Sequence, residues 1–214
     1  MTGKRMINVY RNTSFISLVM AGLALLAVYG ALFPIPASLA FIRFLALGGF
    51  FLLCVCLTIG PLAVIQPSAF CPLIAQRRAI GLASFIFAIG HFLLAFWLQY
   101  GLQIGALLGW PMLVATIGLA LFIILAITSA DWAIKSLPNW KNVQRLAYLA
   151  FAASLMHFIL KANGLFVKVG DATFVNAAEI ALIGFGIIVV ALQVIGFLMI
   201  RGRKVQAGAV CKEN

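Results

Sequence analysis

The chain has 214 residues, of which 65% are hydrophobic and only 9% are charged; soluble globular proteins average about 45–50% and 25%. Its mean hydropathy of +1.17 leaves too few polar side chains to cover a surface that faces water. The composition therefore excludes a soluble globule and predicts an integral membrane protein. No stretch between the apolar runs is long enough to fold as a nucleotide-binding or hydrolytic unit, so an attached soluble catalytic domain is excluded as well.

Six apolar segments are long enough to cross the hydrocarbon core, which takes roughly 20 residues of helix. Breakers at Gly60 and Pro61 and at Pro138 fall where connections are expected, and Pro111 is expected to kink or to start the fourth helix. The first segment has the basic start of a signal peptide, but its apolar run exceeds the roughly 7–15 residues of such a peptide. The predicted spans are 15–33, 39–59, 80–100, 106–127, 146–167 and 177–200.

The fold class predicted from this pattern is an all-α integral membrane protein, a six-transmembrane-helix bundle with both termini on one side. Residues 1–14 are expected to form an N-terminal arm, residues 15–200 the bundle and residues 201–214 a basic tail. Of the 15 Lys and Arg residues, all but Arg43, Lys161 and Lys168 fall on the side of the termini. The positive-inside rule therefore predicts cytoplasmic termini. The net charge of +11 follows from this topology, so membrane lipid is the expected partner of the basic loops and nucleic acid is not.

The acidic residues and the cysteines are not expected to form a site. The acids fall in connections, at a helix end or in the tail, so no carboxylate is available in mid-membrane for an ion relay, which disfavours an ion-coupled transporter. These acids are Asp131, Asp171, Glu179 and Glu213. Cys54 and Cys56 point to different faces of one helix, and Cys71 and Cys211 lie on the reducing side, so all four are expected to be incidental thiols.

The chain has two histidines, His91 in the third predicted span and His157 in the fifth, and ionisable groups inside a membrane are by default functional candidates. His91 lies thirteen residues after Arg78 and His157 twelve residues after Arg145. Both are therefore roughly 18–20 Å from the arginine that anchors their helix at the cytoplasmic side. Two imidazoles at one depth on two helices suit the axial ligation of a b-type haem.

Small side chains accompany both histidines at helical spacing, with Ser84 and alanines around His91 and Ser154 and alanines around His157. They leave room for a flat macrocycle, so His91 and His157 are predicted as metal ligands and Ser84 and Ser154 as cofactor-binding residues. The alternative is that small residues let bare helices pack closely, each histidine being hydrogen-bonded within the bundle.

The basic residues on the outer side have a predicted role in the same site. Arg43 lies near the outer end of the second span, and Lys161 lies one turn outward of His157 on the same helix face. Either could pair with outward-pointing haem propionates, and Lys168 could do so more loosely. The alternative for the two lysines is that they extend to the outer headgroups.

Two stretches resemble the ferric reductase-like transmembrane domains. The first is the arginine pair and glycine of residues 77–82 (RRAIGL), which precede the helix that carries His91. The second joins the fourth and fifth predicted spans and is similar to one branch of that family, the haem-binding membrane subunits of the periplasmic methionine sulfoxide reductase system (the YedZ or MsrQ type). Its residues are Thr128, Ser129, Trp132, Leu137, Trp140, Arg145, Leu146, Tyr148 and His157. The ferric reductase-like core covers roughly residues 39–161.

The resemblance implies a haem-b-binding electron carrier of the bacterial inner membrane, with His91 and His157 as axial ligands. Such a subunit passes electrons from a quinol or flavin donor to a periplasmic redox partner or to other membrane subunits. Members of the family carry a further histidine just before the arginine that opens the fifth span, and this chain has Gln144 there. Because an amide is a poor iron ligand, one haem is predicted. A membrane quinol, or a partner that supplies the missing centre, is then favoured over a cytosolic flavin donor.

Three questions stay open at this point. A member of the family that has lost a histidine could serve as a haem-free accessory or assembly subunit of a larger respiratory or photosynthetic complex. A second question concerns amphipathic side chains near the outer face, which are either candidates for a quinone site or members of the interfacial belt: Trp97, Gln99, Tyr100 and Trp110. Arg77 and Arg78 are expected to anchor the topology, with docking of a cytoplasmic partner as the alternative.

Overall fold

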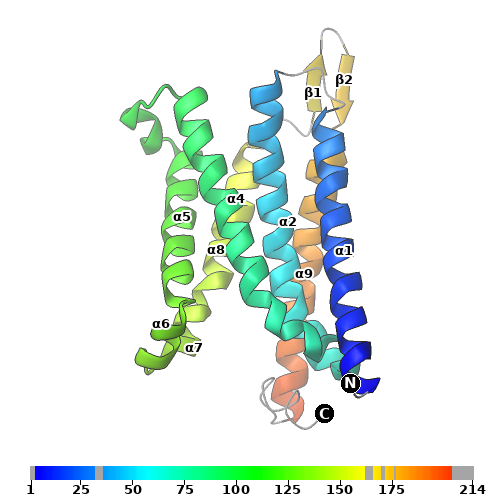
Figure 1. Cartoon of the computed structure of the whole chain (residues 1–214). Coiled ribbons are helices and arrows are strands. Elements are labelled where there is room, and N and C mark those ends of the chain that lie inside the picture. Colours follow the sequence, from blue (N-terminus) through cyan, green and yellow to red (C-terminus); the bar gives the residue numbers. More distant parts are fainter. Residues whose placement is uncertain (1–2, 32–35, 162–165, 170–171, 176, 204–214) are drawn as a thin grey trace.

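Long helices that run side by side make up most of the structure (Figure 1). The computed structural model describes residues 3–31, 36–161, 166–169, 172–175 and 177–203; within these, the side chains of residues 3–13, 29–31, 141, 166–169, 172–175 and 202–203 are left out of the description. In chain order the elements are α1 (Gly3–Ala31), α2 (Ala37–Ile65), α3 (Pro67–Phe70), the 3-10 helix η1 (Cys71–Gln76), α4 (Arg77–Leu98), the 3-10 helix η2 (Ile104–Leu108), α5 (Trp110–Thr128), α6 (Asp131–Ser136), α7 (Trp140–Gln144), α8 (Leu146–Lys161), β1 (Phe166–Val169), β2 (Ala172–Val175) and α9 (Ala177–Arg203).

The prediction of a multi-pass helical membrane protein is confirmed. Among the described residues, five helical stretches are long and apolar enough to cross a membrane, at 37–65, 67–98, 110–128, 142–161 and 177–201. The first predicted span lies in α1. The part of α1 with described side chains contains an apolar helical stretch, Ser14–Val28, that is shorter than the other five. α1 begins and α9 ends at the same, lower end of the bundle in Figure 1.

The structure corrects three details of the predicted elements. α2 does not end at Gly60 but continues through Pro61 to Ile65. The fifth predicted span ends earlier than Val167, because α8 stops at Lys161 and Val167 lies on β1. β1 and β2 form a two-stranded antiparallel hairpin at the upper end, so the architecture is all-helical apart from this hairpin.

The structure also bears on the expectations for Pro111 and for the cysteines. Pro111 occupies the first turn of α5, where a backbone N–H would have no partner within the helix. The missing N–H of proline therefore costs nothing there, and Pro111 starts the helix as predicted. Cys54 and Cys56 are free thiols, as expected. Cys71 is disulfide-bonded, so the expectation of four thiols is wrong, and Cys211 lies outside the described residues.

α2 is the central helix of the bundle and packs against α1, α4, α8 and α9. Ile42, Cys54 and Leu57 on it are almost completely buried. A helix that is apolar on every side is typical of a position surrounded by other helices. Gly49 lets α4 approach closely, because a Cβ atom there would lie 3.2 Å from Cβ of Phe87.

The proline inside α2 is accommodated by a hydrogen bond from another helix. Pro61 has no N–H, so the carbonyl oxygen of Leu57, four residues earlier, loses its usual helical donor. Gln193 of α9 replaces that donor, its Nε2 lying 2.7 Å from the Leu57 oxygen. α9 comes close here because residue 196 is a glycine, whose added Cβ would lie 3.1 Å from Cβ of Pro61.

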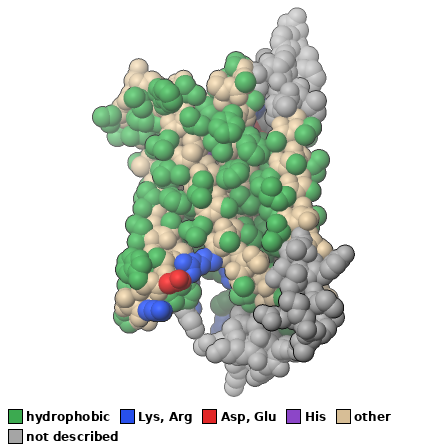
Figure 2. Space-filling model, viewed as in Figure 1, with side chains coloured by type: hydrophobic (Ala, Val, Ile, Leu, Met, Phe, Trp, Pro, Cys, Tyr) green, Lys and Arg blue, Asp and Glu red, His purple; other side chains and the backbone are tan. Residues whose placement is uncertain are grey.

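The two neighbouring arginines at the start of α4 have different contacts. Arg77 donates from Nε to the carbonyl oxygen of Cys56 at 3.2 Å, and its guanidinium lies against Gly60. Arg78 instead forms an exposed ion pair with Asp131 of α6. Arg77 is therefore a packing contact between α4 and α2 as well as a basic residue at the lower end. Figure 2 shows that charged side chains on this face gather at that end, below a broad hydrophobic surface.

We expect Gln193→Leu to lower the free energy of unfolding by about 1–2 kcal/mol, because it leaves the Leu57 carbonyl without a donor in an apolar surrounding. Thermal unfolding in detergent measures the effect. Pro61→Ala restores an N–H to α2, so Gln193→Leu should be less damaging in the Pro61→Ala background. The matched control is Gln103→Leu, which makes the same change at an exposed position. Equal melting temperatures for Gln193→Leu and Gln103→Leu would show that the bond does not stabilise the fold.

Candidate functional site

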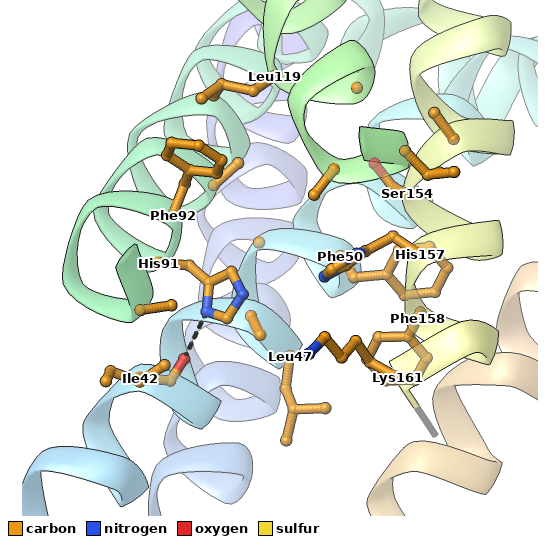
Figure 3. Close-up of a pocket in the computed structure, with 18 of the residues that line it drawn as sticks. Ile42, Leu47, Phe50, His91, Phe92, Leu119, Ser154, His157, Phe158 and Lys161 are labelled. Atoms are coloured by element: carbon orange, nitrogen blue, oxygen red, sulfur yellow. Dashed lines mark hydrogen bonds between the residues drawn. The ribbon is translucent and has the colours of Figure 1, made fainter. Parts of the chain in front are cut away.

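A cavity of about 310 Å³ lies between α2, α4, α5, α8 and α9. Both histidines of the chain line it, His91 from α4 and His157 from α8 (Figure 3). Figure 3 shows the two imidazoles directed into the same space from opposite walls. The structure therefore brings together the pair that the sequence predicted to lie at one depth.

His91 is held by a hydrogen bond to the backbone of α2. Its Nδ1 lies 3.0 Å from the carbonyl oxygen of Ile42. Since a carbonyl oxygen can only accept a hydrogen bond, Nδ1 must carry the proton. In the neutral ring the lone pair is then on Nε2, the nitrogen at the far side of the imidazole.

His157 has the same arrangement with a different helix. Its Nδ1 lies 2.7 Å from the carbonyl oxygen of Pro111, in the first turn of α5. The proline fixes where α5 begins and hence where this oxygen lies. As in His91, Nδ1 donates and the lone pair is left on Nε2.

Neither Nε2 atom has a hydrogen-bond partner among the residues that the structure describes. A histidine that donates from one ring nitrogen to a backbone carbonyl and leaves the other open is the usual state of a metal ligand. Within the described part of the chain, no group of three or more His, Cys, Asp or Glu residues could hold a bare metal ion. Two open imidazoles without further protein ligands fit a metal that brings its own equatorial ligands, as the iron of a haem does.

Aromatic, branched and small side chains together line the cavity. Phe50 of α2 stacks on Phe158 of α8, with ring centroids 5.3 Å apart and planes 12° apart. Glycine and alanine residues at 46, 49, 88, 115, 118 and 153 also line the space. A planar apolar ligand would therefore meet flat rings and backbone beside branched side chains such as Leu47 and Leu119.

Charged side chains gather at the outer rim of the cavity. Arg43 of α2 forms an ion pair with Glu179 of α9, with 3.3 Å between the guanidinium and carboxylate atoms. Lys161 at the end of α8 contacts Tyr100, to whose hydroxyl it donates and over whose ring its Nζ lies 5.2 Å from the centroid. All four line the cavity. The rim thus combines two cations and one carboxylate.

The predicted site residues are divided by the structure. Arg43, Lys161 and Ser154 line the cavity with the two histidines. Ser84 does not line it: the hydroxyl of this completely buried residue donates to the carbonyl oxygen of Gly49 at 2.8 Å, in the contact between α4 and α2. Lys168 lies on β1, whose side chains are outside the description.

Gln144, the departure from the family pattern, is not among the residues that line this cavity. It ends α7, and its Nε2 donates to the hydroxyl of Thr128 at 3.2 Å. Trp140 donates to the backbone oxygen of the same residue at 2.9 Å. The amide at this position therefore joins α7 to the end of α5.

Sequence reasoning missed Glu179 and Tyr100 as rim residues. Glu179 was expected at a helix end, and it does lie in the first turn of α9. A signal was present, since Arg43 and Glu179 both lie within the first two turns of helices that start at the upper end of the bundle in Figure 1. Tyr100 lies two residues beyond α4, where the sequence offered only a choice between a quinone site and the aromatic belt.

Comparison with known proteins agrees with the resemblance predicted from the sequence. The chain is 30% identical over 122 residues to the protein-methionine-sulfoxide reductase heme-binding subunit MsrQ of Agrobacterium fabrum, which covers 54% of this chain and 55% of the relative. Proteins of the same name from Brucella ovis and Brucella melitensis are each 35% identical over 97 residues. The match covers 42% of this chain and 44% of each relative. The chain therefore spans about half the length of the curated relatives it matches. No family model matches it.

We expect Ser84→Ala to lower the melting temperature more than Ser154→Ala. The hydroxyl of Ser84 joins two helices, whereas that of Ser154 donates to Ala150 on its own helix at 2.8 Å. Losing a buried hydrogen bond between helices costs about 0.5–1.5 kcal/mol. Thermal unfolding of the two variants in the same detergent makes the comparison, and an equal loss in both would contradict the assignment of Ser84 to helix packing.

Proposed function

We propose that this chain is a haem-b-binding transmembrane electron-transfer subunit. His91 and His157 would hold the iron through Nε2. The observation that carries the proposal is that both imidazoles donate from Nδ1 to a backbone carbonyl and direct Nε2 into one cavity. Haem b bound there would supply reversible one-electron transfer.

The rest of the cavity supports this ligand. Its volume falls in the lower part of the roughly 300–1,000 Å³ range of ligand pockets. Arg43 and Lys161 at the rim would bind the propionates, because guanidinium and ammonium groups form charge-assisted hydrogen bonds with carboxylates. Ser154 would line the same site, while Ser84 would act through helix packing.

The direction of transfer follows from the arrangement of charges. The lower end carries most of the basic residues, so we place it in the cytoplasm of a bacterial inner membrane, with six spans and both termini inside. The cavity rim then faces the periplasm. From there the subunit would deliver electrons to a periplasmic redox protein; the relatives are named as the heme-binding subunit of a protein-methionine-sulfoxide reductase.

The electron donor would be a membrane quinol or a partner subunit that carries its own redox centre. The two histidines of the chain are both in the cavity, and Gln144 is engaged with Thr128. No further histidine is available for a second haem near the cytoplasmic side. Direct transfer from a cytosolic flavin would therefore have to cross most of the bilayer without a relay.

Purified protein should show haem absorption bands that change between the dithionite-reduced and oxidised states. His91→Ala and His157→Ala should each abolish most of the bound haem, because each removes an axial ligand. Gln144→Ala is the matched control, since it truncates a polar side chain outside the cavity, and it should retain the wild-type spectrum. A colourless, helical and stable wild-type protein would contradict the proposal and favour the haem-free accessory subunit.

The number of haems is a separate prediction. Extraction of the haem and quantification against protein should give about one per chain, because the chain offers one pair of imidazole ligands. Gln144→His returns a histidine at the position that carries one in the family. Its haem content per chain is compared with that of the wild type. Two haems per wild-type chain would show that another residue acts as a ligand and would contradict the single-site assignment.

A further inference from the structure

Glu179 is the feature of the cavity that haem binding alone does not explain. Its side chain is 14% exposed, lines the cavity and pairs with Arg43 across the gap between α9 and α2. Among the described residues that line the cavity, it is the one carboxylate. A site that only had to attract the acidic edge of a haem would contain cations without an anion beside them.

The surroundings of Glu179 keep it negatively charged. It lies in the first turn of α9, where the helix dipole favours an anion. The guanidinium of Arg43 is 3.3 Å away, and Lys161 with Tyr100 lies on the same rim. Among the described residues that line the cavity, the charges therefore sum to one positive charge at neutral pH rather than two.

We propose that Glu179 lowers the reduction potential of the haem held by His91 and His157, an inference that rests on the function proposed above. Reduction adds one electron to the haem, and a fixed carboxylate beside the cavity repels that added charge. The repulsion is effective because the walls are apolar and screen charges weakly. Glu179 also occupies Arg43, whose positive charge would otherwise favour the reduced state.

The sign of the effect follows from this single charge. Removing the carboxylate takes away a negative charge and leaves the charge of Arg43 uncompensated, so the reduced haem becomes more stable. A haem with a lower potential is the stronger reductant for an outward partner. Glu179 is thus a tuning residue that acts through charge and does not touch the iron ligands.

Spectroelectrochemical titration of purified, haem-loaded protein tests the inference. Glu179→Gln should raise the midpoint potential, whereas Glu179→Asp, which keeps the charge, should remain near the wild type. The matched control is Asp131→Asn, which makes the same change of charge in the exposed ion pair with Arg78 at the opposite end of the bundle. It should leave the midpoint potential unchanged.

Several outcomes would overturn the inference. These are a Glu179→Gln potential equal to or below that of the wild type, or an equal rise in Asp131→Asn. Loss of haem from a folded Glu179→Gln protein would also overturn it, since a charge-balancing residue is not needed for binding. If Glu179→Gln does not fold, Glu179→Ala replaces it. If neither folds while Glu179→Asp does, the carboxylate is needed for folding and the inference is overturned. A colourless wild type instead contradicts the proposed function itself.

Discussion

Two backbone carbonyls, those of Ile42 and Pro111, determine what the cavity can do. Each accepts the Nδ1 proton of a histidine on a neighbouring helix, at 3.0 and 2.7 Å, and so fixes both the tautomer and the direction of the ring. Without these bonds the imidazoles could rotate or turn their lone pairs away. The positions of α2 and α5 beside α4 and α8 therefore decide the chemistry of two side chains that they do not carry.

The same requirement, that every polar group in an apolar surrounding finds a partner, also shapes the rest of the bundle. Pro61 frees the Leu57 carbonyl within α2, and Gln193 from α9 occupies it. Arg77 from α4 donates to the carbonyl oxygen of Cys56, the residue before Leu57. These contacts lie toward the lower end of α2, whereas the cavity opens near its upper end. Polar contacts toward the lower end thus hold together helices that also form walls of the cavity.

The outer rim adds charge to this scaffold. Arg43 and Lys161 each have a partner in the structure, Glu179 and Tyr100, so the rim is a balanced set of groups rather than a bare cationic patch. The balance also gives Glu179 its proposed influence on the haem, because its charge acts across an apolar space.

Composition and periodicity predicted the class of protein, the positions of most spans and a matching depth for His91 and His157, because length, hydropathy and helical rise are local properties of a chain. Sequence could not place Ser84 away from the cavity, since one helical turn decides whether a side chain faces a ligand or a neighbouring helix. The sequence predicted that the second span ends before Gly60. The donor for the Leu57 carbonyl, which Pro61 leaves free, comes from residue 193 and could not be foreseen locally. The pairing of Arg43 with Glu179, 136 residues apart, likewise arises only when α2 and α9 pack together.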